Sequence, residues 1–144
     1  MKTATLVLSA AVATVFSWGA AAQEAAKPAG ALSLELNGAQ PSDKGCRLTF
    51  VVNNGLGSDL TKAAFEIALF NDAGVVDRLT VLDFKDLPAD KTKVTRFDLA
   101  GTECAKISRV LVNSVTECVG TGLDTAACAS GLKTTTKAKI AFGT

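Results

Sequence analysis

The sequence predicts an all-β protein: an immunoglobulin-like antiparallel β-sandwich of about seven short strands, held by two disulfides. Three observations predict this fold class. Short segments alternate apolar and polar residues with a period of two, turn-forming residues separate these segments, and four cysteines are spread through the chain. The sequence contains neither a long amphipathic helix pattern nor an internal repeat.

The first 22 residues have the features of a cleavable N-terminal signal peptide. Lys2 supplies a basic start, residues 4–16 are uncharged and almost entirely small or apolar, and Ala20-x-Ala22 suits a signal peptidase. The alternative is a retained membrane anchor, but the apolar run is shorter than the roughly 20 residues that a spanning helix needs. We expect export to the periplasm, or secretion, and no membrane span after cleavage of residues 1–22.

The mature chain is expected to begin at Gln23 with a flexible leader over residues 23–30, followed by one sandwich domain over residues 31–144. The expected strands of that domain are residues 31–37, 46–52, 64–70, 75–84, 91–99, 107–115 and 134–142.

Each strand is predicted from its own pattern. Residues 31–37 place three leucines on one face, residues 46–52 place Cys46 with Leu48, Phe50 and Val52, and residues 64–70 place Phe65, Ile67 and Leu69. Residues 75–84 follow a tight Asn71–Gly74 connection and are expected to bend near Asp83.

The remaining strands follow the same reasoning. Residues 91–99 alternate again after a turn at Pro88, and residues 107–115 are apolar on both faces, which is typical of a central strand. Residues 123–130 are expected to form one helical turn, and residues 134–142 to close the chain with Ala138, Ile140 and Phe142 inward.

Cys46, Cys104, Cys118 and Cys128 are an even number of thiols in an exported chain, which favours two disulfides. The alternative is a zinc site of four thiolates, although the sequence has no paired knuckles. We expect the pairs Cys46–Cys104 and Cys118–Cys128. The second pair closes a short local loop. The first follows from the strand order, because antiparallel pairing of the second and fifth strands brings the start of one beside the end of the other.

Composition excludes several function classes. Removing residues 1–22 takes away one of 15 basic residues, Lys2, and none of the 14 acidic ones, so the mature chain has no net charge to attract nucleic acid. It contains no His and no Tyr, and Trp18 lies in the signal. Sugar-binding and base-stacking surfaces usually need Trp or Tyr, so carbohydrate and nucleic acid are not expected partners.

Three regions are candidate partner-binding surfaces. Lys133, Lys137 and Lys139 have the same parity in the last expected strand, so all three should face solvent together. The alternative is that these lysines protect an edge strand from aggregation. Asn53 and Asn54 begin the loop over residues 53–59, and that loop and the loop between Cys118 and Cys128 are expected contact surfaces.

No catalytic residue, metal site or cofactor is predicted. Four acidic residues lie around the strand before Pro88, in or beside turns, where Asp is common for its local hydrogen bonds; they are Asp77, Asp83, Asp86 and Asp90. Ser42 and Lys44 lie in a turn, and the chain has no His to act as an orienting base.

Three segments together carry a family resemblance: Asn53-Asn54-Gly55, residues 65–76 and residues 87–92. They resemble FxLYD-type bacterial sandwich domains, in which an Asn-rich turn precedes a strand that ends in an apolar-aromatic-Asp step. Here Phe70 stands where Tyr is usual. The chain is also similar to small four-cysteine exported proteins of alphaproteobacteria. The resemblance implies the sandwich fold and no catalytic residues.

These observations lead to one leading hypothesis, a non-enzymatic binding or accessory module that contacts another envelope protein through loops or a sheet edge. A periplasmic protein that binds a small ligand or a metal is the alternative. An enzyme comes third, because it would have to work without His.

Overall fold

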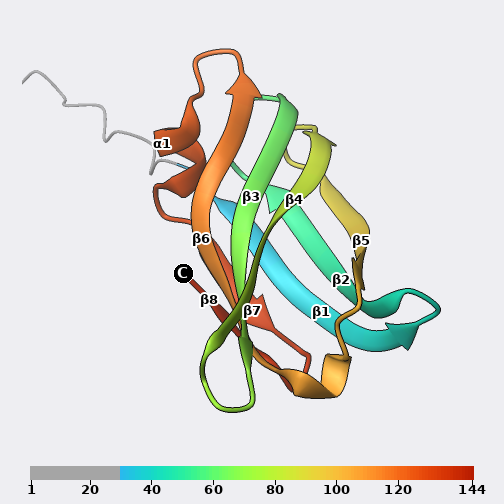
Figure 1. The fold of residues 1–144 in the computed structure, drawn as a ribbon. Helices are drawn as coiled ribbons and strands as arrows, with labels where there is room; N and C mark the ends of the chain where they lie inside the picture. Colours follow the sequence, from blue (N-terminus) through green and yellow to red (C-terminus); the bar gives the residue numbers. More distant parts are fainter. Residues whose placement is uncertain (1–29) are drawn as a thin grey trace, which may run out of the picture.

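Two four-stranded sheets pack face to face in the structure, a computed structural model that describes residues 30–144 (Figure 1). Sheet A has the order β5-β2-β1-β7 and sheet B the order β4-β3-β6-β8. The elements are β1 (Leu32–Ser42), β2 (Gly45–Asn54), β3 (Leu60–Asn71), β4 (Val76–Leu87), β5 (Thr92–Ala100), the 3-10 helix η1 (Cys104–Lys106), β6 (Ile107–Gly120), α1 (Thr125–Ala129), β7 (Lys133–Thr136) and β8 (Ala141–Gly143). The expected signal peptide and most of the expected leader lie outside the described residues.

The predicted sandwich is confirmed, including its central pairing. β2 lies antiparallel between β1 and β5, and β3 lies antiparallel between β4 and β6. Cys46, near the start of β2, pairs with Leu99, near the end of β5. The second and fifth strands therefore meet as the strand order required.

The alternating residues build the core between the sheets. The three leucines of β1, the Cys46 face of β2 and the Phe65 face of β3 are all buried, as their period of two predicts. Phe50 of β2 packs edge to face against Phe84 of β4 and Phe142 of β8, with ring centroids 5.6 and 5.5 Å apart. Because β2 belongs to sheet A and the other two strands to sheet B, these contacts join the two layers.

Both expected disulfides are present. Cys46 is bonded to Cys104 with Cα atoms 4.9 Å apart, and Cys118 is bonded to Cys128. The second bond ties α1 to the end of β6. Asp124 caps α1 by accepting a hydrogen bond from the backbone N–H of Ala127, which explains the expected helical turn in this loop.

The bend expected near Asp83 is a β-bulge. The β3–β4 register shifts there, Lys85 has a positive φ of 64°, and Asp83 Oδ1 accepts the backbone N–H of Lys85. This side chain supplies the local hydrogen bond that a bulged strand needs.

The single last strand expected over residues 134–142 is wrong. The segment forms two short strands in different sheets, β7 parallel to β1 and β8 parallel to β6, so the sandwich has eight strands. Thr136 explains the break, because its hydroxyl accepts the N–H of Ala138 and lies 3.1 Å from the carbonyl oxygen of Ile140, to which it can donate. Lys137 and Lys139 therefore lie between strands, and only Lys133 is in a strand. Ala138, Ile140 and Phe142 do face the core.

Within residues 30–144, no helix has the length and the apolar character that crossing a membrane would require. Two disulfides are typical of a protein in an oxidising compartment.

Removing the two disulfides should have unequal effects. In the loop-closure model, Cys46–Cys104 spans 58 residues and should contribute about 4 kcal/mol, and Cys118–Cys128 spans 10 and should contribute about 3 kcal/mol. Denaturant unfolding of the double-alanine variants, in which both cysteines of one pair are replaced together, would measure these two contributions.

Non-reducing peptide mapping of the unaltered protein should find only these two pairs. A crossed pair would contradict the strand order.

Candidate functional site

Asn53 and Asn54, expected to begin a loop, are the last two residues of β2, and the loop that follows, residues 55–59, is organised from within by Asn54. This residue is completely buried, and its amide donates to the carbonyls of Ser58 and Leu87 at 2.9 and 2.8 Å. Its Oδ1 accepts the N–H of Leu56. The expectation that Asn54 contacts a partner is therefore corrected: its polar atoms are used inside the loop, beneath its surface.

Asn53 is half-buried and holds the same loop from outside. Its amide donates to Lys91 O and to the hydroxyl of Thr92, the residue opposite Asn53 at the start of the neighbouring strand β5. Asp59 Oδ1 accepts the N–H of Ala89 at the other end of the loop. Hydrogen bonds therefore fix the loop to its neighbours on both sides. If this loop binds a partner, it would do so in the conformation seen here.

The three C-terminal lysines are exposed but do not form the predicted stripe. Lys133 begins β7, whereas Lys137 and Lys139 lie in the connection to β8. Lys137 Nζ lies 3.3 Å from Glu35 Oε1 on β1. The pKa of Glu35 is lowered, first by the hydrogen bond from the amide of Asn37 and then by Lys137.

A feature that sequence reasoning missed is an exposed apolar surface on β4. Four of the six large hydrophobic side chains that are exposed among residues 30–144 lie on this strand or beside its start: Val75, Val76, Leu79 and Val81. Leu79 is 55% exposed and Val81 51%. Exposed apolar residues concentrated on one strand are typical of an interaction surface, whereas scattered ones are not. We call Leu79 and Val81 the β4 surface.

The register places the β4 surface on the outside of sheet B. Leu79 lies opposite Ala68 of β3 and Val81 opposite Glu66, whereas Thr80, between them, pairs with the buried Ile67. The sequence signal was available, because residues 75–84 are apolar at outward as well as inward positions. That pattern normally indicates a central strand, but β4 is at the edge of its sheet.

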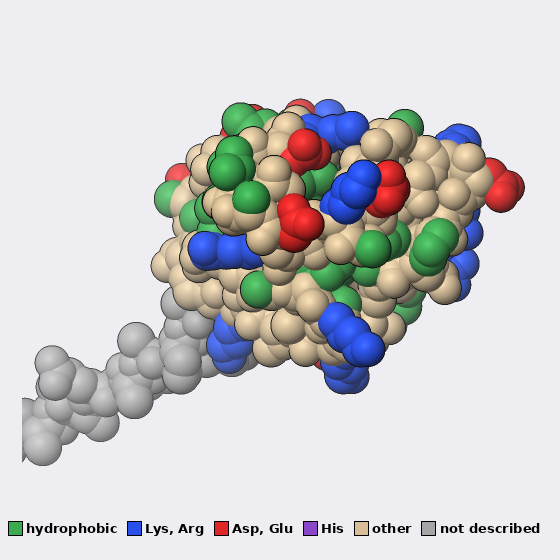
Figure 2. Space-filling model, turned by 60° about the horizontal axis from the view of Figure 1, so that its bottom comes forward, with side chains coloured by type: hydrophobic (Ala, Val, Ile, Leu, Met, Phe, Trp, Pro, Cys, Tyr) green, Lys and Arg blue, Asp and Glu red, His purple; other side chains and the backbone are tan. Residues whose placement is uncertain are grey.

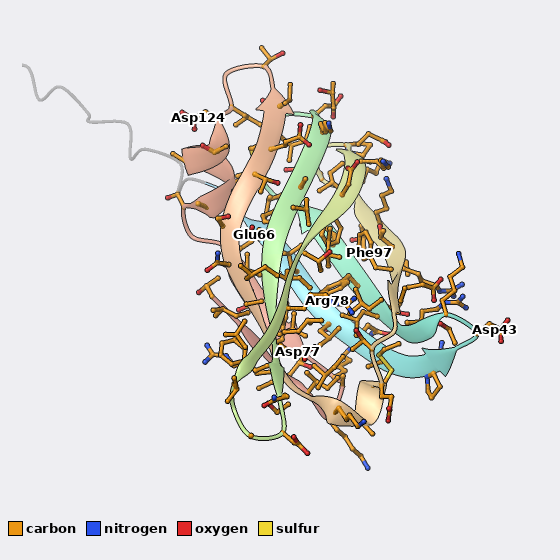
Figure 3. The ribbon with its side chains drawn as sticks, viewed as in Figure 1. Asp43, Glu66, Asp77, Arg78, Phe97 and Asp124 are labelled. Carbon is orange, nitrogen blue, oxygen red and sulfur yellow. A yellow bond between two sulfur atoms is a disulfide. The ribbon has the colours of Figure 1, made fainter. Side chains whose placement is uncertain are left out.

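Two basic side chains cross from one sheet to the other beside β4. Lys93 of β5 donates to the carbonyls of Phe84 and Asp86, at 3.2 and 2.8 Å. Arg78 of β4 donates to Ala100 O at the end of β5, at 2.9 Å. Figure 3 shows Arg78 and Phe97 on this side of the sandwich, between β4 and β5. These side chains link β4 to β5 near both ends of the two strands, although β4 and β5 do not pair with each other.

A cavity of about 320 Å³ lies at the end of the sandwich, between the β3–β4 hairpin and η1. Leu69, Phe70 and Ile107 give it an apolar lining, and Asp72, Asp77 and Glu103 bring carboxylates to it. Glu103 is paired with Lys106 at 2.9 Å, whereas the two aspartates form no ion pair within the described part of the chain. Figure 2, which turns this end of the molecule forward, shows acidic and basic side chains intermixed around apolar ones.

The four acidic residues near the Pro88 turn are not gathered in one site. Asp77 lines the hairpin cavity, and Asp83 accepts from Lys85 Nζ at 2.6 Å, which together with the Lys85 N–H lowers the pKa of Asp83. Asp86 is 3.3 Å from Lys93, and Asp90 occupies a turn position with a positive φ. Across residues 30–144, no group of three or more His, Cys, Asp or Glu side chains is arranged to hold a metal ion.

Ser42 and Lys44 also lack the geometry of a catalytic pair. The Ser42 hydroxyl oxygen is buried and makes no hydrogen bond of regular geometry with any group of residues 30–144, and Lys44 is exposed at the turn between β1 and β2. The neighbouring ion pair is Arg47 with Asp98, joined by two hydrogen bonds of 3.0 and 3.1 Å. Arg47 holds the pKa of Asp98 below its usual value, and this surface pair links β2 to β5.

No family model, no curated protein and no solved structure matches this chain. The resemblance to FxLYD-type domains stays a prediction, and the case for a function rests on the residues described above.

Replacing Asn54 should destabilise the domain far more than replacing its neighbour. Asn54→Ala would remove the side-chain donor from the carbonyls of Ser58 and Leu87, the second of them buried, at a cost of about 1–3 kcal/mol. Asn53→Ala removes half-buried contacts and should cost less than about 1 kcal/mol. Denaturant unfolding of both variants would measure the difference. Equal effects would show that Asn54 does not organise the loop.

Proposed function

We propose that this protein is a non-enzymatic binding or accessory module of the cell envelope that contacts a protein partner through β4. The single observation that supports this most is the β4 surface, where two aliphatic side chains are more than half exposed on one edge strand. Leaving such side chains in water gives no benefit to the isolated fold, so their grouping favours a contact.

The periplasmic location is part of the proposal. It rests on the signal-like residues 1–22 and on the two disulfides, which form and persist in oxidising compartments. A β-sandwich held by two disulfides provides a rigid frame for an edge strand, and rigid frames lose little conformational entropy on binding.

Site-specific photo-crosslinking in intact cells would test the contact. A benzophenone amino acid in place of Leu79 or Val81 should give a discrete protein adduct after irradiation. The same probe in place of Thr125, which is exposed on α1, serves as the matched control and should give none. Adducts of equal yield at all three positions, or no adduct at residues 79 and 81, would contradict the proposal.

A second candidate function is binding of a small cationic ligand in the hairpin cavity. Its volume of about 320 Å³ is in the range of small-molecule sites, and Asp72 and Asp77 supply negative charge beside an apolar lining. A ligand that binds only the folded protein raises its melting temperature. A panel of amines and divalent cations should therefore contain a compound that stabilises the unaltered protein but not Asp72→Asn/Asp77→Asn; a panel without any shift would contradict this candidate.

A further inference from the structure

β4 is an edge strand of sheet B, and only part of its free edge is protected. Toward its end, Lys93 occupies the carbonyls of Phe84 and Asp86, and the bulge at Asp83–Lys85 interrupts the regular strand. At its start, a second register shift separates Val76 from Arg78. Bulges and lysines are the usual devices that keep another strand from pairing with an edge.

Between these devices lies a regular stretch, Arg78–Leu82, which we call the open stretch. Among residues 30–144, no strand pairs with its free side. Its outward side chains are the β4 surface, Leu79 and Val81, and neither is charged. An unprotected regular edge with apolar side chains is a template for a further strand, because its free N–H and C=O groups are unpaired.

The other three edges are less suited to accept a strand. β7 and β8 have only four and three residues. β5 is long, and its Val94 is exposed, but the next outward positions are the charged Arg96 and Asp98. The open stretch of β4 is therefore the long edge with uncharged outward side chains.

We propose that the occupant of the open stretch is the same stretch of a second copy of this chain, paired antiparallel about a two-fold axis at Thr80. This inference rests on the proposed function, whose partner it names. With Thr80 on the axis, Leu79 of each copy lies opposite Val81 of the other. Directly opposite side chains in an antiparallel pair have Cβ atoms about 4.5–5.5 Å apart. The dimer would therefore contain two equivalent Leu79–Val81 contacts, one on each side of the axis.

Neighbouring registers match less well. An axis at Leu79 would set Val81 opposite Asp77, and an axis at Val81 would set Leu79 opposite Asp83, so each places an apolar side chain against a carboxylate. An axis at Leu79 or at Val81 would pair only that one side chain with an apolar partner, its own copy. The Thr80 register alone gives both Leu79 and Val81 an apolar partner. A slip of one residue is excluded for a different reason, since it would turn the outward face of one copy toward the core side of the other.

Charges at the ends of the open stretch are complementary in the Thr80 register. Lys85 lies just beyond one end of the open stretch and Asp77 just before the other, so a two-fold pairing brings the Lys85 end of one copy beside the Asp77 end of the other. The Lys85 side chain is 71% exposed and can reach across. Within each copy Lys85 is also paired with Asp83, at 2.6 Å, so Lys85, Asp83 and Asp77 of the other copy would meet at each end of the contact.

The pairing also closes on itself. A two-fold contact uses the same surface on both copies, so no second open stretch is left over to extend a fibre. Sheet B would become one continuous sheet across both copies. A strand of a different protein would need apolar side chains two residues apart on one face, as Leu79 and Val81 are, to make the same contacts.

The oligomeric state of the full exported chain, purified with its disulfides intact, tests the inference. Sedimentation velocity over a dilution series should show a dimer that dissociates as the concentration falls. Leu79→Lys/Val81→Lys should be monomeric at every concentration, with an unchanged circular dichroism spectrum. Val119→Lys alters a side chain that is 51% exposed on β6, away from the open stretch, and is the matched control that should remain dimeric.

The crosslinking adducts separate the two proposals. A benzophenone at residue 79 should join two copies of this chain, with the adduct mapped by mass spectrometry to β4 of the second copy. A monomeric protein whose residue 79 crosslinks to a different protein would overturn the second copy and leave the proposed function standing. A dimer that survives Leu79→Lys/Val81→Lys would overturn this pairing, and the absence of any adduct would overturn both.

Discussion

The packing of Phe50 between the sheets is the interaction on which the rest of the structure depends. Its ring is buried and meets three other aromatic rings, two from sheet B and that of Phe97 from its own sheet. Edge-to-face contacts of this kind hold rings in fixed orientations and add to the energy of burial. Because Phe84 belongs to β4 and Phe97 to β5, this cluster sets where the two edge strands lie.

The covalent and polar links around this core act at its ends. The Cys46–Cys104 bond connects the start of β2 to η1, and the Cys118–Cys128 bond holds α1 on β6. Arg78 and Lys93 join the β4 and β5 edges from opposite strands. The result is a sandwich with three edges that are short, charged or partly covered, and one, β4, that has an uncovered apolar stretch.

Much of this could be predicted because side chains alternate across a strand. The leucines of β1 and the Phe65 face of β3 determine which way those strands face, and the order of the second and fifth strands determines the Cys46–Cys104 pair. The division of residues 134–142 into two strands could not be predicted. Ala138, Ile140 and Phe142 keep the alternation of a single strand, whereas the hydrogen bond between the Thr136 hydroxyl and the N–H of Ala138 ends β7. The burial of Asn54 could not be predicted either. An Asn-Gly step normally indicates an exposed turn, and only the fold places Leu87 O where the Asn54 amide can donate to it.

The position of β4 escaped prediction for a related reason. A segment that is apolar on both faces is expected in the middle of a sheet, yet β4 lies at the edge, and only the topology reveals that Leu79 and Val81 have no cover. This mismatch between pattern and position connects the fold to its proposed role. Leu79 and Val81 are the apolar outward side chains that a central strand would keep covered, and a second copy would cover them.

Amide hydrogen exchange measured at several protein concentrations tests that claim most directly. If β4 becomes a central strand on association, those amides of residues 78–82 that point away from β3 should exchange more slowly as the concentration rises. Those of β5 should not change. Exchange at residues 78–82 that is independent of concentration would contradict the account.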